Sequence, residues 1–410
     1  MKKTFYGWWI TLAAFCTFGI SVGIPYYNMP FFYDYFEKTF GWSRADVTLG
    51  FPLAALLTLW VGPVLVHRFS PRKLIITGTG LLFLAFVGFG RMSGSLWVYF
   101  AVWFIWVVGY IFAGPIPHQV IVSQWFRRLR GRAMAVTYVG VAVGGSLGSY
   151  LVKPLTEGFG FQTALQIMGL VLFLAWPIAI WAMKDRPSDM GLHPDGAAAS
   201  APETAQRPRD FGDLLRRPAF WLLAAGSCCS IAAIGAVNQH MKLVFLDQGF
   251  TDQAALNSVW RVASMLTLWS SIAGRLVMGW LADRFSKKYV MASTYLLVSL
   301  TIPLLLLVRP GHTGYLYVFA VLFGFGMGAD YMLIPLMAAE QFGVNTLARA
   351  MAIILPTDTI GQTWFPYLVS RLRLHFGDYG HALTAVFLVA FLGFLAIAWL
   401  PKQGTRDAAL

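Results

Sequence analysis

The sequence predicts an all-α membrane protein of twelve transmembrane helices in two pseudo-symmetric six-helix bundles. The first observation is composition: hydrophobic residues make up 58% of the 410 residues and charged residues 12%, whereas a soluble domain carries about 25% charged residues. The second is an internal repeat, because segments 118–136 and 335–353 share the ending Arg-Ala-Met-Ala followed by Val or Ile. Long repeats in an apolar chain are typical of membrane proteins whose two halves form a binding site at their interface.

Twelve apolar stretches, each of about 20 residues, follow one another along the chain. The first, from Tyr6, follows Lys2 and Lys3 as a secretory signal would. It is too long for a signal and has no small-residue cleavage site before Asp34, so we expect a retained helix. The stretches are centred near Phe18, Leu56, Leu82, Val108, Val143, Val171, Ile231, Ser270, Val298, Gly326, Ile360 and Ala390.

Basic residues predict the orientation of these helices. They cluster in alternate loops, and the intervening loops carry little excess charge. This positive-inside pattern predicts a multi-pass protein of the cell (inner) membrane with both termini in the cytoplasm. It also accounts for the net charge of +13 without nucleic-acid binding. The clusters lie at 2–3, 68–73, 127–132 and 284–288.

A linker separates the two halves. Residues 184–217 are rich in proline, alanine and charge and show no apolar helical period until Phe211. We therefore expect a cytoplasmic linker that is partly disordered, with a short interfacial turn before Pro218 at the start of the seventh helix. The N-terminal bundle is then 1–183 and the C-terminal bundle 218–410.

Glycines recur at helical spacing on the fifth and tenth expected helices, at 140–148 and 324–328. They remove side-chain bulk, so neighbouring helices can approach closely. Such faces suit packing that slides or rocks, and they suit tight static packing equally well.

The loop after the eighth helix reads GWLADRFSKK, with Asp283 and Arg284 where the chain leaves the membrane. It resembles the signature loop of the major facilitator superfamily, which forms a cytoplasmic charge latch between helices. The matching first-half segment, GPVLVHRFSPRK, places His67 at the acidic position beside Arg68 and carries one inserted residue. The resemblance implies the major facilitator fold and a latch involving Asp283, Arg284 and Arg68.

Other segments narrow the resemblance. YGWWI at 6–10, FGWSRAD at 40–46, WFRRLRGRAMAVTYVG at 125–140 and GRLVMGWLADRF at 274–285 look like the monocarboxylate transporter and oxalate/formate antiporter branch. The resemblance covers the chain outside the linker. It implies a bacterial homologue that transports small carboxylates by alternating access.

Arg275 is the first candidate site residue. It lies eight residues before Asp283, roughly 12 Å inside the cytoplasmic end of its helix. A guanidinium there costs about 2.5–3.5 kcal/mol, so it must face a cavity or a partner. Its parallel N–H donors match a carboxylate, and in the resembling family this arginine binds the substrate carboxylate. The alternative is a permanent salt bridge to Asp330 or Asp358.

Asp330 and Asp358, within the tenth and eleventh helices, are the candidate proton-coupling residues. A carboxyl group in low dielectric can take up a proton near neutral pH and release it when exposed to the other side. Asp358 shares a helix face with Gly361 and Gln362. For each aspartate the alternative is a structural hydrogen bond to a backbone or tyrosine group.

His118, within the fourth helix, is a candidate substrate-binding residue and a further proton-site candidate, because a histidine can change charge near neutral pH. The alternative is a hydrogen-bonded packing residue. Three polar side chains are further candidate substrate contacts, each with packing as the alternative: Tyr27, Asn28 and Tyr331.

Three polar residues near the outer end of the seventh helix are expected to line the outer mouth of the transport path: Asn238, Gln239 and His240.

Charged residues that related carriers have and this chain lacks reduce the number of candidate substrates. Eukaryotic relatives carry an aspartate where this chain has Ser271, and a lysine in the first helix where it has 26–28, so proton symport cannot be carried over residue by residue. Oxalate carriers of the branch add a lysine on the eleventh helix, but residues 351–369 hold no basic residue. A monocarboxylate of the lactate or pyruvate type is therefore predicted, with an oxalate/formate-type exchanger as the alternative.

Nothing in the sequence indicates an enzyme, a cofactor or a metal site. There is no GxxxxGK[ST] loop and no metal-ligand spacing of His and Cys. Cys16, Cys228 and Cys229 lie in apolar stretches, and adjacent cysteines bridge only with strain, so no disulfide is expected. We expect a monomer in the lipid bilayer whose partners are a monocarboxylate and a proton. A nontransporting carboxylate sensor is the rival from another class, and the linker offers it no obvious output module.

Overall fold

The computed structural model describes residues 5–196, 210–250 and 252–401. The predicted disorder of the central linker falls partly on residues outside these ranges. Within them the chain is almost entirely helical, with one isolated β-bridge between Arg309 and His312. The chain divides into two compact units, 1–206 and 207–410, and the boundary lies inside the expected linker.

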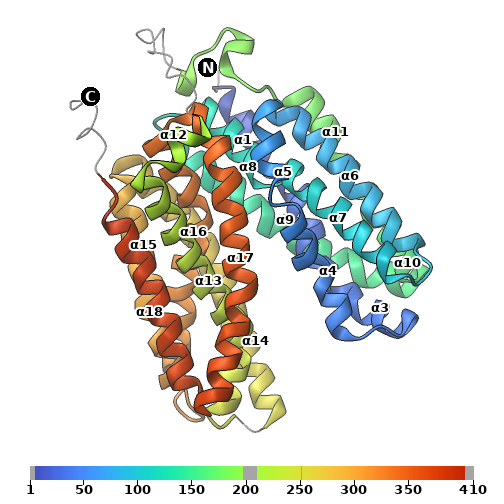
Figure 1. Ribbon diagram of the computed structural model, residues 1–410, viewed down its shortest axis with the longest axis vertical. Helices are drawn as coiled ribbons and strands as arrows, with labels where there is room; N and C mark the ends of the chain where they lie inside the picture. Colours follow the sequence, from blue (N-terminus) through green and yellow to red (C-terminus); the bar gives the residue numbers. More distant parts are fainter. Residues whose placement is uncertain (1–4, 197–209, 251, 402–410) are drawn as a thin grey trace. The chain divides into compact units, whose positions relative to one another are not determined.

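Unit 1 holds the helices of the first repeat, and short π or 3₁₀ segments labelled η join several of them into longer runs (Figure 1). Its elements are α1 (Gly7–Phe18), η1 (Gly19–Gly23), α2 (Ile24–Asn28), η2 (Met29–Phe32), α3 (Tyr33–Phe40), α4 (Arg44–Leu57), α5 (Val61–Leu65), η3 (Val66–Arg68), α6 (Pro71–Arg91), α7 (Leu96–Ala113), α8 (Pro115–Trp125), α9 (Arg130–Phe159), α10 (Phe161–Val171), η4 (Leu172–Leu174), α11 (Ala175–Pro177), η5 (Ile178–Ala182), η6 (Pro187–Met190) and η7 (Pro194–Gly196).

Unit 2 is built from fewer and longer helices. Pro218 lies in the first turn of α13, as predicted, where its missing N–H costs no helical hydrogen bond. The elements are α12 (Phe211–Leu215), α13 (Pro218–Asp247), α14 (Gln253–Arg284), α15 (Lys287–Thr301), η8 (Ile302–Leu307), α16 (Gly314–Phe342), α17 (Val344–Phe376) and α18 (Tyr379–Ala398).

Within the described ranges, ten helices are long and apolar enough to cross a membrane, or eleven if a bent pair counts as one span. The pair is Asp46–Leu57 and Val61–Arg68, bent by 41°. The one predicted stretch outside this count is the eleventh, near Ile360, which is α17. Its 33 residues exceed the length that a bilayer needs, but Asp358, Gln362 and two internal prolines lower its hydropathy.

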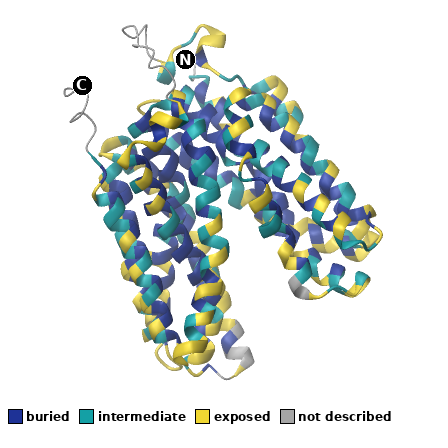
Figure 2. Cartoon of the chain, viewed as in Figure 1, coloured by how far each residue is buried: buried dark blue, intermediate teal, exposed yellow. Residues whose placement is uncertain are grey.

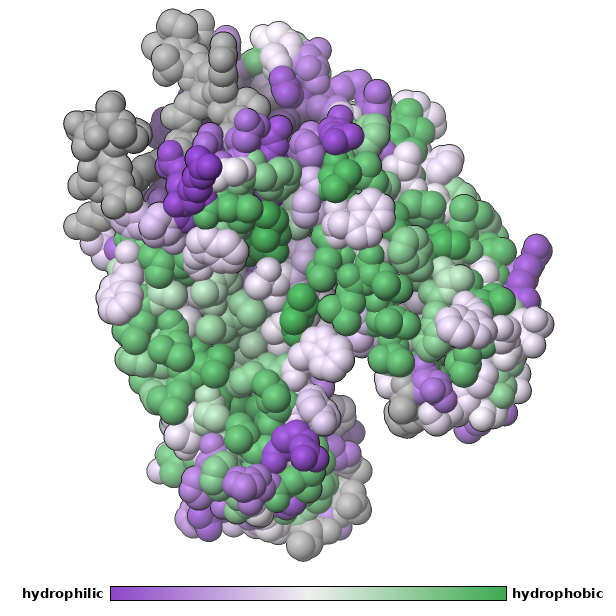
Figure 3. Space-filling view, viewed as in Figure 1, coloured by the Kyte–Doolittle hydropathy of each residue, from purple (hydrophilic) through white to green (hydrophobic). Residues whose placement is uncertain are grey.

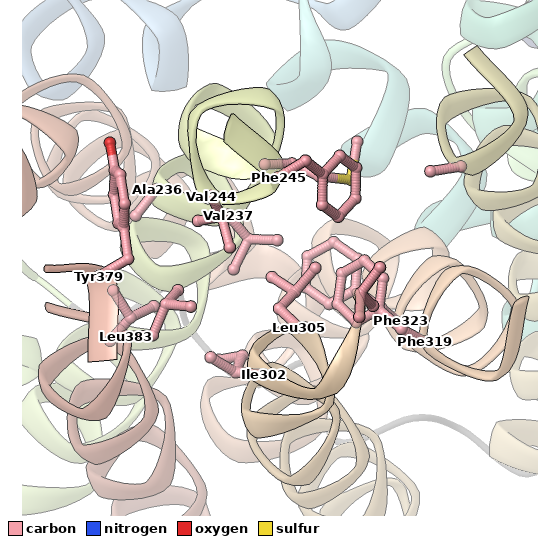
Figure 4. Packing of buried hydrophobic residues seen from close by; sticks show 14 of the residues in the cluster. Ala236, Val237, Val244, Phe245, Ile302, Leu305, Phe319, Phe323, Tyr379 and Leu383 are labelled. Carbon is pink, nitrogen blue, oxygen red and sulfur yellow. The ribbon is translucent and has the colours of Figure 1, made fainter. Parts of the chain in front are cut away.

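Each unit has its own apolar interior (Figure 2). Aromatic residues dominate the core of unit 1, where Trp103 and Trp106 pack with ring centroids 5.2 Å apart. The core of unit 2 is mainly aliphatic, with Phe319 stacked on Phe323 (Figure 4). On the face of unit 2 that Figure 3 shows, apolar residues cover the middle of the bundle and hydrophilic residues gather toward its ends, as expected for a helical bundle surrounded by lipid.

Glycines bring helix backbones into contact in both units, as the sequence predicted. In unit 1 a Cβ atom at Gly144 would lie 2.2 Å from the carbonyl oxygen of Gly19. In unit 2 a Cβ at Gly328 would lie 2.0 Å from that of Ser271. These positions tolerate no side chain, so α1 with η1 packs directly on α9, and α14 packs directly on α16.

Residues 184–196, the first part of the expected linker, are folded onto unit 1, and we call this segment the clasp. At its start the indole Nε1 of Trp125 donates to the carbonyl of Lys184 (2.8 Å). The carboxylate of Asp185 accepts from the backbone N–H of Arg72 (3.0 Å), in the first turn of α6. A negative charge there stabilises a helix N-terminus.

The far end of the clasp is held by Asp195. Its carboxylate accepts from the backbone N–H groups of Arg127 (3.0 Å), Arg128 (2.8 Å) and Leu129 (3.4 Å), just before α9. In the described residues, Asp195 is the one non-glycine residue with positive φ (58°). Aspartate tolerates this conformation better than most residues, and the three hydrogen bonds hold it there.

Candidate functional site

Two buried carboxyl groups converge on α13 in unit 2. The hydroxyl of Ser227 donates to Oδ1 of Asp358 on α17 (2.7 Å), and that of Ser230 donates to Oδ2 of Asp330 on α16. Both aspartates have 0% exposure. Ser227 and Ser230 lie three residues apart, so they share a face of α13. That face therefore holds carboxyl groups from two other helices.

Each aspartate keeps one carboxyl oxygen unbonded. In the described ranges, Oδ1 of Asp330 and Oδ2 of Asp358 have no hydrogen-bond partner, and neither aspartate forms an ion pair with a described cation. The predicted alternative of a permanent salt bridge from Arg275 to either aspartate is therefore not found in this part of the chain. The hydrogen bonds that do form come from serines rather than from a backbone or tyrosine group.

A third polar side chain, Tyr295 on α15, completes the group. It is fully buried, and its hydroxyl lies close enough to both carboxyl groups to interact electrostatically, nearest to Asp330. It is outside hydrogen-bond geometry with Asp330 and has no other hydrogen bond in the described residues. Neither Tyr295 nor the two serines was predicted from the sequence. The Ser-x-x-Ser spacing in an apolar helix was the available signal.

The predicted polar face of α17 is confirmed. Asp358 contacts Ser227, a Cβ at Gly361 would lie 2.8 Å from Sγ of Cys228, and the side chain of Gln362 meets Gly235. All three residues therefore face α13. Gln362 also accepts a hydrogen bond at Oε1 from the hydroxyl of Tyr331 (2.9 Å), so this predicted contact residue is tied to the same helix.

Arg275 lies on α14, half-buried, one turn after Ser271. Its Nη1 donates to the Ser271 hydroxyl (3.4 Å). Thr267 meets Gly324, Ser270 bonds to Val321, Ser271 meets Gly328 and Gly274 meets Phe325, so α14 and α16 run parallel. Arg275 directly follows Gly274, which meets Phe325, five residues before Asp330 on α16.

The unit 1 candidates are engaged in packing. His118 is fully buried after the break between α7 and α8. Its Nδ1 donates to the carbonyl of Gly114 (2.7 Å), its Nε2 lies 2.9 Å from the hydroxyl of Thr17, and Phe18 stacks on the ring with centroids 4.6 Å apart. A neutral ring satisfies both contacts, which favours the packing interpretation of His118.

Asn28 joins α2 to α9. Its Nδ2 donates to the carbonyl oxygens of Ile24 (2.8 Å) and Gly145 (3.2 Å), and its Oδ1 accepts from Ser149 (2.9 Å). Tyr27 is 57% exposed beside it. Asn28 therefore has a structural role, and Tyr27 presents the freer surface of the two.

His240 does not line an outer mouth. It is buried, with Nδ1 2.8 Å from the hydroxyl of Tyr379 and Nε2 2.9 Å from the carbonyl of Pro366. The expectation was wrong for this residue because both ring nitrogens are used between helices. Asn238 and Gln239 are exposed, as expected of a mouth.

The predicted latch residues lie at the ends of their helices. Asp283 and Arg284 close α14, and the Arg284 guanidinium lies 4.1 Å from the centre of the Trp280 ring, a cation–π contact. Arg68 ends η3 and is exposed. The latch itself stays a prediction.

The comparison with known protein families matches two successive segments of the chain. The family profile of the Major Facilitator Superfamily matches residues 116–268 and 261–409. The chain is 26% identical to the MFS transporter asaE of Aspergillus flavus, over 98% of this chain and 87% of that protein. It is 25% identical to the membrane sensor protein UhpC of Salmonella typhimurium, over 59% of this chain and 57% of that protein.

Two further similarities bear on branch and fold. Monocarboxylate transporter 11 of Mus musculus is 25% identical over 68% of this chain and 60% of its own length. The outward-facing crystal structure of the transporter FucP superposes with a TM-score of 0.71 at 14% identity, covering 96% of this chain and 99% of FucP. At that identity the superposition establishes the fold alone.

Proposed function

Since the chain belongs to the major facilitator superfamily and is a multi-pass membrane transporter of that type, we propose that it moves a small monocarboxylate of the lactate or pyruvate type. Transport is secondary, driven by alternating access and coupled to protons. The substrate carboxylate binds Arg275, and a proton binds Asp358 or Asp330. The similarity to monocarboxylate transporter 11 supports the substrate class.

The observation that carries the proposal is the buried carboxyl group pair of unit 2. Burying an ionised carboxylate costs several kcal/mol unless a partner compensates it, and the described residues supply serine hydroxyls rather than a cation. A protonated carboxyl group avoids that cost. Such a group can bind a proton when the site faces one side of the membrane and release it when the site is hydrated from the other side.

Arg275 supplies the complementary charge for an anion. Its guanidinium can donate two parallel N–H bonds to one carboxylate. No basic residue lies between Met351 and Val369 on α17, where a second cation would be needed to hold a dicarboxylate. A monoanion together with one proton adds no net charge to the protein, so translocation of the loaded form should be insensitive to membrane potential.

Uptake of radiolabelled lactate into proteoliposomes tests the proposal. With an inward proton gradient we expect accumulation that collapses when a protonophore is added. Uptake indifferent to the gradient would contradict proton coupling. Absence of lactate uptake would contradict the monocarboxylate assignment and make oxalate/formate-type exchange the next hypothesis.

Arg275→Gln tests the binding residue. Removing one partner of a desolvated charge pair costs about 2–5 kcal/mol, so the Kd for lactate should rise at least about 30-fold. Arg261→Gln is the matched control, because Arg261 lies on the same helix and is exposed. Both variants must match the unmodified protein in size-exclusion profile and Tm. Unchanged affinity in folded Arg275→Gln protein would refute the assignment.

The similarity to UhpC favours one second candidate, a carboxylate sensor that binds without transporting. The same vesicles separate the two functions. Saturable lactate binding to the purified protein without uptake would support the sensor, and uptake by the purified protein would exclude a binding-only role.

A further inference from the structure

The two carboxyl groups of unit 2 are close enough to share one electrostatic environment. The serines that hold them, Ser227 and Ser230, are one turn apart on α13, and the Cβ atoms of such residues lie about 5–6 Å apart. Each serine is in direct hydrogen-bond contact with its aspartate. The carboxyl groups of Asp330 and Asp358 also interact electrostatically with each other.

Two negative charges held by serines one turn apart in an apolar interior repel each other, so ionising both carboxyl groups costs more than ionising one. Two carboxyl groups that share a site behave as one unit, in which the first proton is held strongly and the second is lost more readily. The groups facing this unit in the described structure are the phenol of Tyr295 on α15 and the thiols of Cys228 and Cys229 on α13. None of these neutral groups is a cation that would stabilise a second negative charge.

We propose that Asp330 and Asp358 hold one proton between them as a single proton site, and that Tyr295 is a positioning residue that stabilises the ionised form of that site. This inference rests on the proposed function for its place in transport. Under it, the two aspartates are not alternative proton carriers. Neither aspartate suffices alone, and one proton is taken up in each cycle.

The case for Tyr295 comes from its unused hydroxyl. The ring is fully buried, its hydroxyl has no hydrogen bond in the described residues, and it lies beside Asp330. Oδ1 of Asp330 likewise has no partner there. A small movement brings a phenol O–H donor and a carboxylate acceptor together. Such a bond strengthens when the carboxylate is ionised, so it favours the ionised site.

Infrared spectroscopy of the carboxyl groups tests the inference without any substrate. The purified protein is titrated, and the bands are assigned with Asp330→Asn and Asp358→Asn. We expect two protonation steps separated by more than about 1 pH unit. In either single variant, the remaining aspartate should titrate in one step. That step should lie more than about 1 pH unit below the upper step of the unmodified pair, because the negative neighbour is gone. If each aspartate titrates at the same pH with and without the other, the pair is refuted.

Tyr295→Phe tests the positioning role. Loss of the donor should move the ionisation step of the pair to higher pH by about 0.5–1 pH unit, as expected for a lost hydrogen bond to the charged form. Tyr99→Phe is the matched control, because Tyr99 is equally buried but donates to the carbonyl of Val47 in unit 1 (2.5 Å). A Tyr295→Phe titration that coincides with that of the control would refute the role of Tyr295.

The transport assay then separates this inference from the proposed function. Coupled titration with no lactate uptake would overturn the substrate assignment and leave the carboxyl pair in place. Proton-coupled lactate uptake that survives in Asp330→Asn with its stoichiometry unchanged would overturn the shared site and leave the transporter assignment in place.

Discussion

Gly328→Ala tests the backbone contact between α14 and α16. The added Cβ would lie 2.0 Å from the carbonyl oxygen of Ser271, whereas ordinary van der Waals contact begins at 3.4 Å. The obstructing atom is backbone and cannot rotate away. The helices must therefore separate by roughly 1.4 Å, the difference between these distances. Overpacking of this kind costs about 1–3 kcal/mol, against a gain of up to about 1 kcal/mol from the better helix propensity of alanine.

We therefore expect a net loss of about 1–2 kcal/mol, measured as a lower Tm of the purified protein. Because Arg275 follows Ser271 by one turn, lactate affinity should fall as well. Gly314→Ala is the control, since Gly314 begins the same helix and has nothing within 4 Å of its added Cβ. A Tm and lactate affinity for Gly328→Ala equal to those of the control would refute the close contact. Loss of stability with an unchanged uptake rate at saturation would favour static packing over sliding.

Two other side chains that hold helix ends give further predictions. Asp195→Asn should speed hydrogen exchange at the amides of 127–129 about tenfold, for a loss of about 1.5 kcal/mol, and unchanged exchange would contradict the clasp contacts. The backbone N–H of His381 holds the pKa of Asp378 below its ordinary value, so this carboxylate stabilises α18 above the usual aspartate range of about 3.9 and loses that effect as pH falls through the lowered pKa. Asp378→Ala should lower Tm at pH 7 but not at low pH, and a deficit that persists at low pH would count against this cap.

The sequence was sufficient to predict where most helices lie, because long apolar runs have few other stable states. It did not predict the break at Gly114 between α7 and α8, where the φ and ψ of one glycine interrupt a continuous apolar run. It counted α17 as an ordinary span, although the polar residues that make α17 a candidate for chemistry also lower its hydropathy. Periodicity reports burial, and it carries little information about local backbone breaks.

The candidate site was predictable only in part. Asp330 and Asp358 could be identified because an ionisable group in an apolar helix is costly and therefore rare. Ser227 and Ser230 carried only the Ser-x-x-Ser spacing as a signal, because serine hydroxyls usually bond to their own helix backbone, and a buried tyrosine such as Tyr295 is an ordinary core residue. Which of them faces a carboxyl group depends on how α13, α15 and α16 are rotated against one another, and a single sequence does not contain that information.

The clasp has a consequence for changes in chain length. Asp185 and Asp195 are hydrogen-bonded to the starts of two different helices of unit 1. The segment between them must therefore span a fixed distance. One residue added or removed there would force one carboxylate off its amides. We therefore expect that insertions between residues 185 and 195, including affinity tags and fluorescent reporters, disturb the fold of unit 1. Composition alone would have predicted a linker that tolerates them.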